Sequence, residues 1–163
     1  MIKTTQDLTQ LANKKRCSKK CQKQEIRVCI GSSCLSLGAD KLQKDLKDEI
    51  EAKNLTQNFR VKSVGCNGLC ANGILISHYN ALTKKETLYE KITASDVKPL
   101  IKSIKKGNKL KNKLCDTNQP FFTKQTKIVL KNAGVVDPND IQDYIAYGGY
   151  NTLFKAINEM LPQ

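Results

Sequence analysis

Two pairs of cysteines, each directly after a short apolar run, constrain this chain more than any other feature. Cys29 and Cys34 stand in the run IRVCIGSSC, and Cys66 and Cys70 stand in VKSVGCNGLC. The 31 residues between the pairs have room for a helix and a strand. We therefore expect two strand-ending loops that present four thiols as a soft, all-sulfur metal site.

The segment around the first pair predicts a strand–helix–strand unit. Residues 25–30 alternate and are rich in β-branched side chains, which is typical of a strand, and residues 59–64 repeat that pattern. Between them, leucine or isoleucine recurs every four residues at 42, 46 and 50, so an amphipathic helix is expected from Ala39 to about Lys53. Such a unit is most naturally parallel and right-handed.

Two more strands and a helix are expected after the second pair. GILISH (73–78) and TLYEKI (87–92) are typical of strands joined by a turn near Asn80. Ser95 is expected to cap a helix that Gly107 ends, with its apolar face at Val97, Leu100, Ile101 and Ile104. The predicted fold class is α/β: a thioredoxin-like four-stranded mixed sheet in the order β-α-β-β-β-α, plus a small helical C-terminal module.

The remaining segments differ in composition from this unit. Residues 1–24 predict a basic N-terminal helix with an apolar stripe, residues 25–106 the thioredoxin-like domain, and residues 107–119 a lysine-rich linker. In the C-terminal module, 120–163, we expect a short strand over 127–130 and a helix that Asp137 caps, with Pro138 first. The apolar faces expected for the terminal helices are Leu8, Leu11 and Ala12, then Ile141, Tyr144 and Ile145, then Leu153, Phe154, Ile157 and Leu161.

The net charge of +13 is confined to the leader and the connector. Residues 97–115 carry seven lysines and no acid, while the cysteine-bearing segment is nearly neutral. Such runs are usually solvated tethers, and docking onto an acidic partner is the main alternative. No aromatic residue is interleaved with either run for base stacking, so we expect no nucleic-acid binding. With no apolar stretch of membrane-spanning length and no secretory signal, we expect a cytoplasmic protein that does not insert into a membrane.

Cysteine thiolates select zinc, copper(I) or iron–sulfur centres. A [2Fe–2S] cluster needs four ligands, two on each iron, which suits two separate pairs. A structural zinc site remains the alternative. The chain would then be a four-cysteine zinc-stabilised adaptor that docks an acidic partner, although the two cysteine pairs of a zinc site usually lie closer together in sequence. Small residues near the thiols are expected to let backbone N–H groups approach the sulfurs: Gly31, Ser32, Ser33, Gly65, Gly68 and Gly73.

The other candidate ligands are interpreted as structural or incidental. His78 is the only histidine, which excludes a Rieske centre with two histidines, and we expect it to be half-buried. Cys17 and Cys21 lie one helical turn apart, so a metal pair there is geometrically possible. We interpret both as incidental thiols, and no role is assigned to Cys115. No nucleophile, base and orienting group occur together, so no catalytic residue is predicted.

The runs CIGSSCLSLGA and VGCNGLCANG, with their 31-residue gap, resemble the thioredoxin-like [2Fe–2S] ferredoxins of NADH dehydrogenases and related flavoproteins. The resemblance implies that Cys29, Cys34, Cys66 and Cys70 are the cluster ligands and that the chain carries electrons. Many members have proline after the glycine of the second motif, where this chain has Ile74. That difference affects the shape of the loop rather than the ligand set.

The tail from PFFTKQTKIVL onwards is similar to the start of the NADH-binding flavoprotein subunit. The combination resembles the diaphorase subunit of NAD-reducing or electron-bifurcating hydrogenases, cut before the FMN and NADH domain. The resemblance therefore implies partners among flavoprotein, hydrogenase or NADH dehydrogenase subunits, with homo-oligomers possible. FMN and NADH themselves are not expected on this chain, which lacks the glycine-rich phosphate loop.

Overall fold

The computed structural model describes residues 4–20 and 23–160. Its centre is a four-stranded sheet in the order β2-β1-β3-β4, built from β1 (Gln24–Cys29), β2 (Phe59–Val64), β3 (Ile76–Asn80) and β4 (Lys85–Tyr89). β1 pairs with β2 in parallel and with β3 antiparallel, and β4 pairs antiparallel with β3. The predicted mixed α/β fold with four strands is confirmed.

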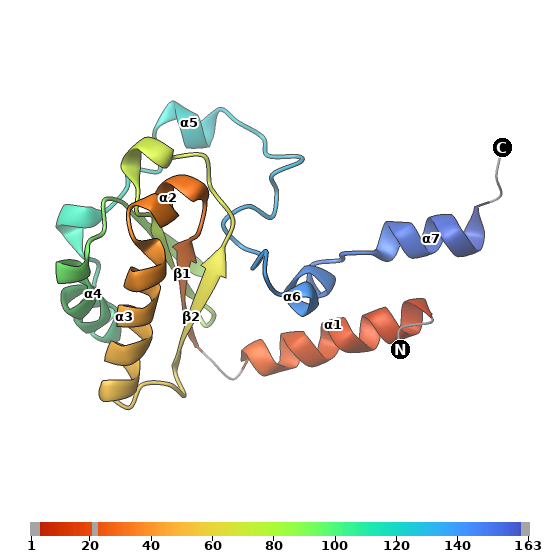
Figure 1. The fold of residues 1–163 in the computed structure, drawn as a ribbon, viewed down its shortest axis with the longest axis horizontal. Coiled ribbons are helices and arrows are strands. Elements are labelled where there is room, and N and C mark those ends of the chain that lie inside the picture. Colours follow the sequence, from red (N-terminus) through yellow and green to blue (C-terminus); the bar gives the residue numbers. More distant parts are fainter. Residues whose placement is uncertain (1–3, 21–22, 161–163) are drawn as a thin grey trace.

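Two helices lie against one face of this sheet, α3 (Ala39–Ala52) and α4 (Val97–Lys105) (Figure 1). The four-residue spacing on α3 puts Leu42, Leu46 and Ile50 on one side of the helix, and all three are buried. The expected face of α4 is buried as well. Together with Ile26 and Val28 of β1 these side chains form the main hydrophobic core.

The other face of the sheet is polar and nevertheless buried. Alternation along β1 and β2 directs Arg27 and Lys62 away from the main core, and they are only 5% and 2% exposed. Arg27 is paired with Glu25 of its own strand at 2.6 Å and with Glu86 of β4 at 3.1 Å. This face is buried because the C-terminal part of the chain packs on it.

The N-terminal helix and the last two helices pack together. α1 (Thr5–Lys20), α6 (Ile141–Ala146) and α7 (Asn151–Glu159) form an arm beside the sheet, with α1 and α7 alongside each other (Figure 1). Its small core contains Leu8, Ala12 and Ile145, with Leu11 and Phe154 packed against them. The predicted basic leader is thus packed against the C-terminal module rather than separate from it.

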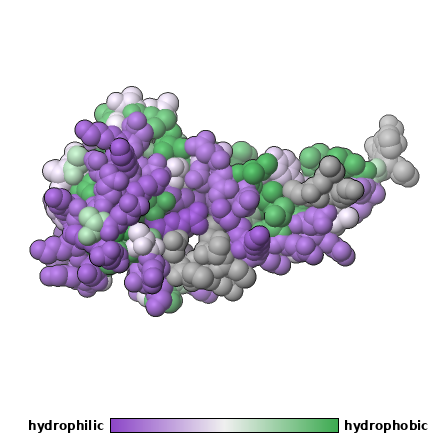
Figure 2. Space-filling model, turned by 60° about the horizontal axis from the view of Figure 1, so that its bottom comes forward, coloured by the Kyte–Doolittle hydropathy of each residue, from purple (hydrophilic) through white to green (hydrophobic). Residues whose placement is uncertain are grey.

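Much of the arm's surface is apolar, as Figure 2 shows beside the hydrophilic body of the sheet. Ile141, Tyr144 and Ile157 are 61%, 46% and 70% exposed. The prediction that Ile141 and Tyr144 belong to the apolar, inward face of α6 was therefore wrong. Ile145 is buried as predicted, but its buried neighbours are Asp143 and Ala146, because Asp143 pairs with Lys62 of the sheet.

Several expected boundaries differ from the structure. The chain from Gly31 to Cys34 is not a loop, because a short helix, α2 (Ser32–Ser36), begins directly after Gly31. Helix α4 is not capped by Ser95: Thr93 and Asp96 form a capping box around a 3₁₀ turn that precedes it.

Two expectations for the C-terminal module were also wrong. Residues 127–130 form a bend and a turn instead of a strand, and they pair with none of the four strands of the sheet. Ile128 and Val129 are 81% and 93% exposed. Asp140 rather than Asp137 is the N-cap of α6, and its carboxylate accepts from the backbone N–H groups of Gln142 and Asp143.

The predicted linker is attached to the edge of the sheet. Leu114 forms a β-bridge with Tyr89, and the Cys115 N–H donates to the Leu88 carbonyl at 3.0 Å. Lys113 is ion-paired with Asp96 at 2.9 Å. The second half of this lysine-rich run is therefore held in place. Within the described ranges, no helix is long and apolar enough to cross a membrane.

Candidate metal centre

The first cysteine pair lies at the carboxyl end of β1. Cys29 is the last residue of the strand, held by a hydrogen bond from its N–H to the Leu75 carbonyl at 3.1 Å. Cys34 lies in α2, which begins at Ser32 with Gly31 as its N-cap. Both thiols are almost fully buried, at 2% and 1% exposure.

The second pair lies in the irregular loop that follows β2. The Cys66 and Cys70 Sγ atoms are 3.6 Å apart, and the Gly68 N–H donates to the Cys66 sulfur at 3.2 Å. Gly68 has a φ of +87°, which favours glycine, and this conformation turns the loop back from Cys66 to Cys70. Cys66 is half-buried and Cys70 is exposed, so this side of the centre faces solvent.

The sheet brings the two pairs together. β1 and β2 are parallel neighbours with Cys29 opposite Val64, so both loops leave the same end of the sheet. A Cβ atom at Gly31 would lie 3.0 Å from the Cys66 Cβ and 3.6 Å from the Cys29 sulfur. A Cβ atom at Gly73 would lie 3.4 Å from both the Cys34 sulfur and the Cys70 carbonyl oxygen. At each of these glycines, one loop closely approaches the other.

The proximity of the thiols shifts the pKa values of Cys29 and Cys70. Burial raises the pKa of Cys29 to about 12, and the neighbouring Cys34 and Cys66 sulfurs add to the rise. The pKa of Cys70 is raised by its hydrogen bond with Cys66 and further by the charges of Cys66 and Cys34. Each pair is thus coupled to a member of the other, and a bound cation that converts the thiols to thiolates would release protons.

Backbone donors of the expected kind are present at both loops. The Gly31 N–H donates a hydrogen bond to the Cys29 sulfur, which opposes the rise of the Cys29 pKa. The Gly68 N–H donates to the Cys66 sulfur. Hydrogen bonds to thiolate sulfur stabilise the negative charge and adjust the potential of an iron–sulfur centre.

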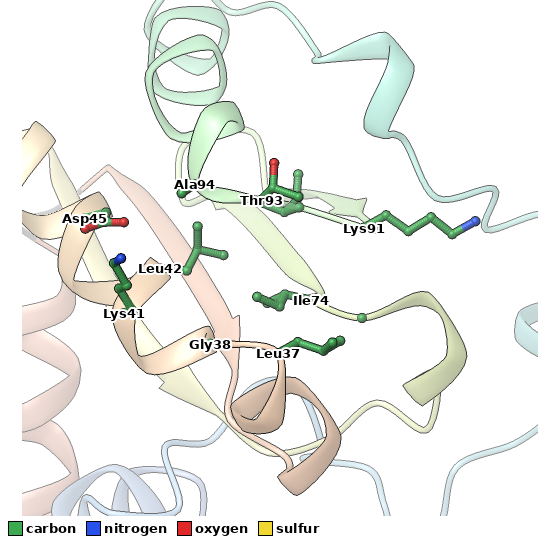
Figure 3. Close-up of a pocket in the computed structure, with 11 residues that line it drawn as sticks. Leu37, Gly38, Lys41, Leu42, Asp45, Ile74, Lys91, Thr93 and Ala94 are labelled. Carbon is green, nitrogen blue, oxygen red and sulfur yellow. The ribbon is translucent and has the colours of Figure 1, made fainter.

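A hollow of about 330 Å³ lies beside Gly73. Its wall is apolar, and Figure 3 shows Leu37, Leu42 and Ile74 along it, with Lys41 and Asp45 on the α3 side. A Cβ atom at Gly73 would lie 3.1 Å from Leu37 Cδ1 and 3.4 Å from the Cys34 sulfur, so this glycine connects the hollow to the thiols. The Gly73–Ile74 peptide bond is cis.

The other candidate residues lie apart from the four thiols. His78 is half-buried on β3, as expected, with its Nε2 2.5 Å from the Gln24 Oε1. Cys115 is a buried free thiol whose pKa is raised to about 11 by burial and by Glu90. The side chain of Cys17 and the whole of Cys21 are outside the described residues, so the possible metal pair there is untested.

The donor set fits an iron–sulfur cluster in its chemistry. Four thiols in two pairs, one from each loop, match the two ligands that each iron of a [2Fe–2S] centre needs. In the described parts of the chain, no group of three or more His, Cys, Asp or Glu residues is arranged so as to hold a metal ion, and this includes the four cysteines.

Residues 15–105 match the family model of the thioredoxin-like [2Fe–2S] ferredoxins. The chain belongs to this family. The cofactor of the family is a [2Fe–2S] cluster, and the four-stranded α/β fold agrees with a ferredoxin unit of this kind.

Solved ferredoxins have the same fold. The wild-type thioredoxin-like [2Fe–2S] ferredoxin from Aquifex aeolicus superposes with a TM-score of 0.51 at 15% identity, over 58% of this chain and 98% of that one. A second structure of a thioredoxin-like [2Fe–2S] ferredoxin from the same organism gives 0.50 at 16% identity, over 57% and 90%. The family match ends at residue 105, so the C-terminal part of this chain lies beyond it.

Sequence reasoning missed the residues that join this C-terminal part to the ferredoxin unit. Phe121 lies against Gly68, and Lys62 forms a fully buried ion pair with Asp143. A lysine inside the strand pattern FRVKSV was the only signal, and alternation alone assigns such a residue to a solvent-facing side.

Proposed function

We propose that Cys29, Cys34, Cys66 and Cys70 ligate a [2Fe–2S] cluster and that the chain is a one-electron carrier. The observation that carries the proposal is the meeting of two cysteine pairs at one end of the parallel β1–β2 pair. When bound, such a cluster takes up and returns a single electron. The chain's own residues position the ligands and donate N–H groups to them.

Each part of the site has a definable task in this proposal. The buried Cys29 and Cys34 hold the inner side of the centre, and the exposed Cys70 lies on the side open to a partner. Gly31 and Gly73 keep the loops close, since a side chain at either would contact a ligand residue. We assign the electron-carrying unit to residues 25–106, with residues 120–163 as a docking module for a partner subunit.

We further propose that the partner is a flavoprotein of the NADH dehydrogenase or hydrogenase type, in the cytoplasm. The similarity of residues 120–161 to the start of the NADH-binding subunit supports this assignment. On that proposal the chain is the ferredoxin-like part of a diaphorase and exchanges electrons with a flavin that another domain supplies.

Anaerobic reconstitution with iron and sulfide tests the cluster. We expect a reddish-brown protein with about two irons and two sulfides per chain, whose visible absorption bleaches with dithionite. Cys34→Ser should lose or change the reduced-state EPR signal, while Cys115→Ser, the control at a buried thiol apart from the site, should keep it. A colourless protein that holds one zinc per chain would refute the proposal and favour the zinc-stabilised adaptor.

A further inference from the structure

The C-terminal segment, residues 116–147, lies on the loop that carries Cys66 and Cys70. This segment is outside the part of the chain that matches the ferredoxin family. It contacts the loop at Gly68 and Asn67, and it contacts β2, the strand that leads into the loop, at Lys62. The three contacts involve different parts of the segment.

The first contact places an aromatic ring against Gly68. A Cβ atom at Gly68 would lie 3.5 Å from Phe121 Cζ. Phe121 lies in α5 (Pro120–Thr123), and its ring packs edge-on against Phe122 with centroids 5.2 Å apart. Gly68 is also the residue whose N–H donates to the Cys66 sulfur, so the ring packs on the turn that supplies this hydrogen bond.

The second contact lies one residue closer to Cys66. A Cβ atom at Gly134 would lie 2.3 Å from the Asn67 Oδ1 and 2.7 Å from its Cγ. The Asn67 amide therefore packs directly on the Gly134 backbone, where only glycine leaves room. Gly134 also has a φ of +75°, a second reason for glycine at this position.

The third contact anchors the segment to the sheet. Lys62 Nζ is 2.5 Å from the Asp143 Oδ2, and both side chains are fully buried. The same ammonium group donates to the Val135 carbonyl, and the Asp143 carboxylate accepts from the Asp137 N–H at 2.8 Å. A buried pair with further hydrogen bonds is the arrangement that keeps such charges compensated.

The loop itself has few internal means of holding its shape. Residues 65–69 belong to no helix or strand, and two of them are glycines. A loop of this kind samples many conformations unless neighbouring groups pack on it. The segment that supplies such packing here comes from more than fifty residues further along the chain.

We propose that the C-terminal segment is a brace that holds the Cys66–Cys70 loop in the geometry needed by the ligands, with Phe121 as a positioning residue. This inference rests on the proposed function, because the brace would hold the ligands of the proposed cluster. Removing the Phe121 ring frees the turn at Gly68, so Cys66 and Cys70 separate more often and the cluster is lost faster.

The experiment compares the full-length wild-type chain with Phe121→Ala, Phe121→Leu and Phe154→Ala. Phe154→Ala is the matched control, since it removes the same atoms from the core of the arm. Cluster loss is followed anaerobically as bleaching of visible absorption in excess EDTA, and the reduction potential is measured by dye titration. We expect Phe121→Ala to lose the cluster about tenfold faster, which corresponds to about 1.4 kcal/mol, with a changed potential. Phe121→Leu should restore most of the difference, and Phe154→Ala should behave as wild type.

A second readout separates this inference from the proposed function. In the iron-free full-length chain, shown to be folded by circular dichroism, the rate at which iodoacetamide modifies Cys66 is measured by mass spectrometry. Faster modification in Phe121→Ala than in Phe154→Ala supports the brace even if no cluster assembles. Equal rates in all variants, with equal cluster loss, overturn the brace even if the cluster is present. Equal acceleration by both alanine variants also overturns it, because the effect would then be global.

Discussion

Replacing Asp143 with asparagine should destabilise the whole fold, although residue 143 lies far along the chain from the sheet. The substitution keeps the shape of the side chain and an oxygen that can accept from the Asp137 N–H. It removes the negative charge that lies 2.5 Å from the fully buried Lys62 ammonium in the wild type. Breaking a buried pair on one side costs about 3–5 kcal/mol.

That cost is a large part of the stability of a chain of this size. Single domains unfold with about 5–15 kcal/mol, and each kcal/mol lowers the Tm by about 2–4 °C at this length. We therefore expect a Tm decrease of about 10 °C. Urea unfolding followed by far-ultraviolet circular dichroism gives the free energy difference from the midpoint and the slope.

Two comparisons make the reasoning refutable. Glu49→Gln removes one charge from the surface pair with Lys53, whose lysine is 38% exposed, and should cost below about 1 kcal/mol. Replacing both members of the buried pair, as Lys62→Met with Asp143→Leu, should recover most of the stability because no uncompensated charge remains. A loss below about 1 kcal/mol for Asp143→Asn, or a double variant no better than the single one, would contradict the argument.

Three further predictions follow from the site and the sheet. Gly31→Ala should reduce cluster retention, because its Cβ would lie 3.0 Å from the Cβ of Cys66. Retention is measured as iron per chain after gel filtration. Gly65→Ala is the control and should retain the cluster, since no atom lies within 4 Å of its Cβ. Burial lowers the pKa of His78 from 6.5 to about 4, so the unfolded chain takes up the proton first and stability falls as the pH drops from 6.5 to 4. That loss is about 1–2 kcal/mol after allowance for partial exposure. Between pH 6.5 and 4, the urea midpoint of His78→Gln should fall less than that of the wild type. An equal fall in both proteins would refute the prediction. Iodoacetamide should modify Cys115 slowly at pH 8 in the folded chain, since burial raises its pKa to about 11, and modification as fast as in urea would contradict this.

Local patterns in the sequence were sufficient for the ferredoxin unit. The spacing of Leu42, Leu46 and Ile50 places them on one side of a helix whatever the helix packs against, and all three are buried. The alternating runs at 25–30 and 59–64 predicted β1 and β2, and parallel pairing of these strands was enough to predict that the two cysteine pairs meet. These features depend on residues that are near one another in sequence.

Only the tertiary structure decided how the C-terminal part relates to this unit. Alternation assigns Lys62 to the side of β2 away from the core, and nothing within the strand shows that Asp143, 81 residues later, reaches it. The same contact sets the orientation of α6, which is why Asp143 is buried and Tyr144 is exposed. Hydrophobic periodicity reports which side of an element avoids water. It carries no information about a distant charged partner, so the buried polar face and the segment on the Cys66–Cys70 loop were visible only in the folded chain.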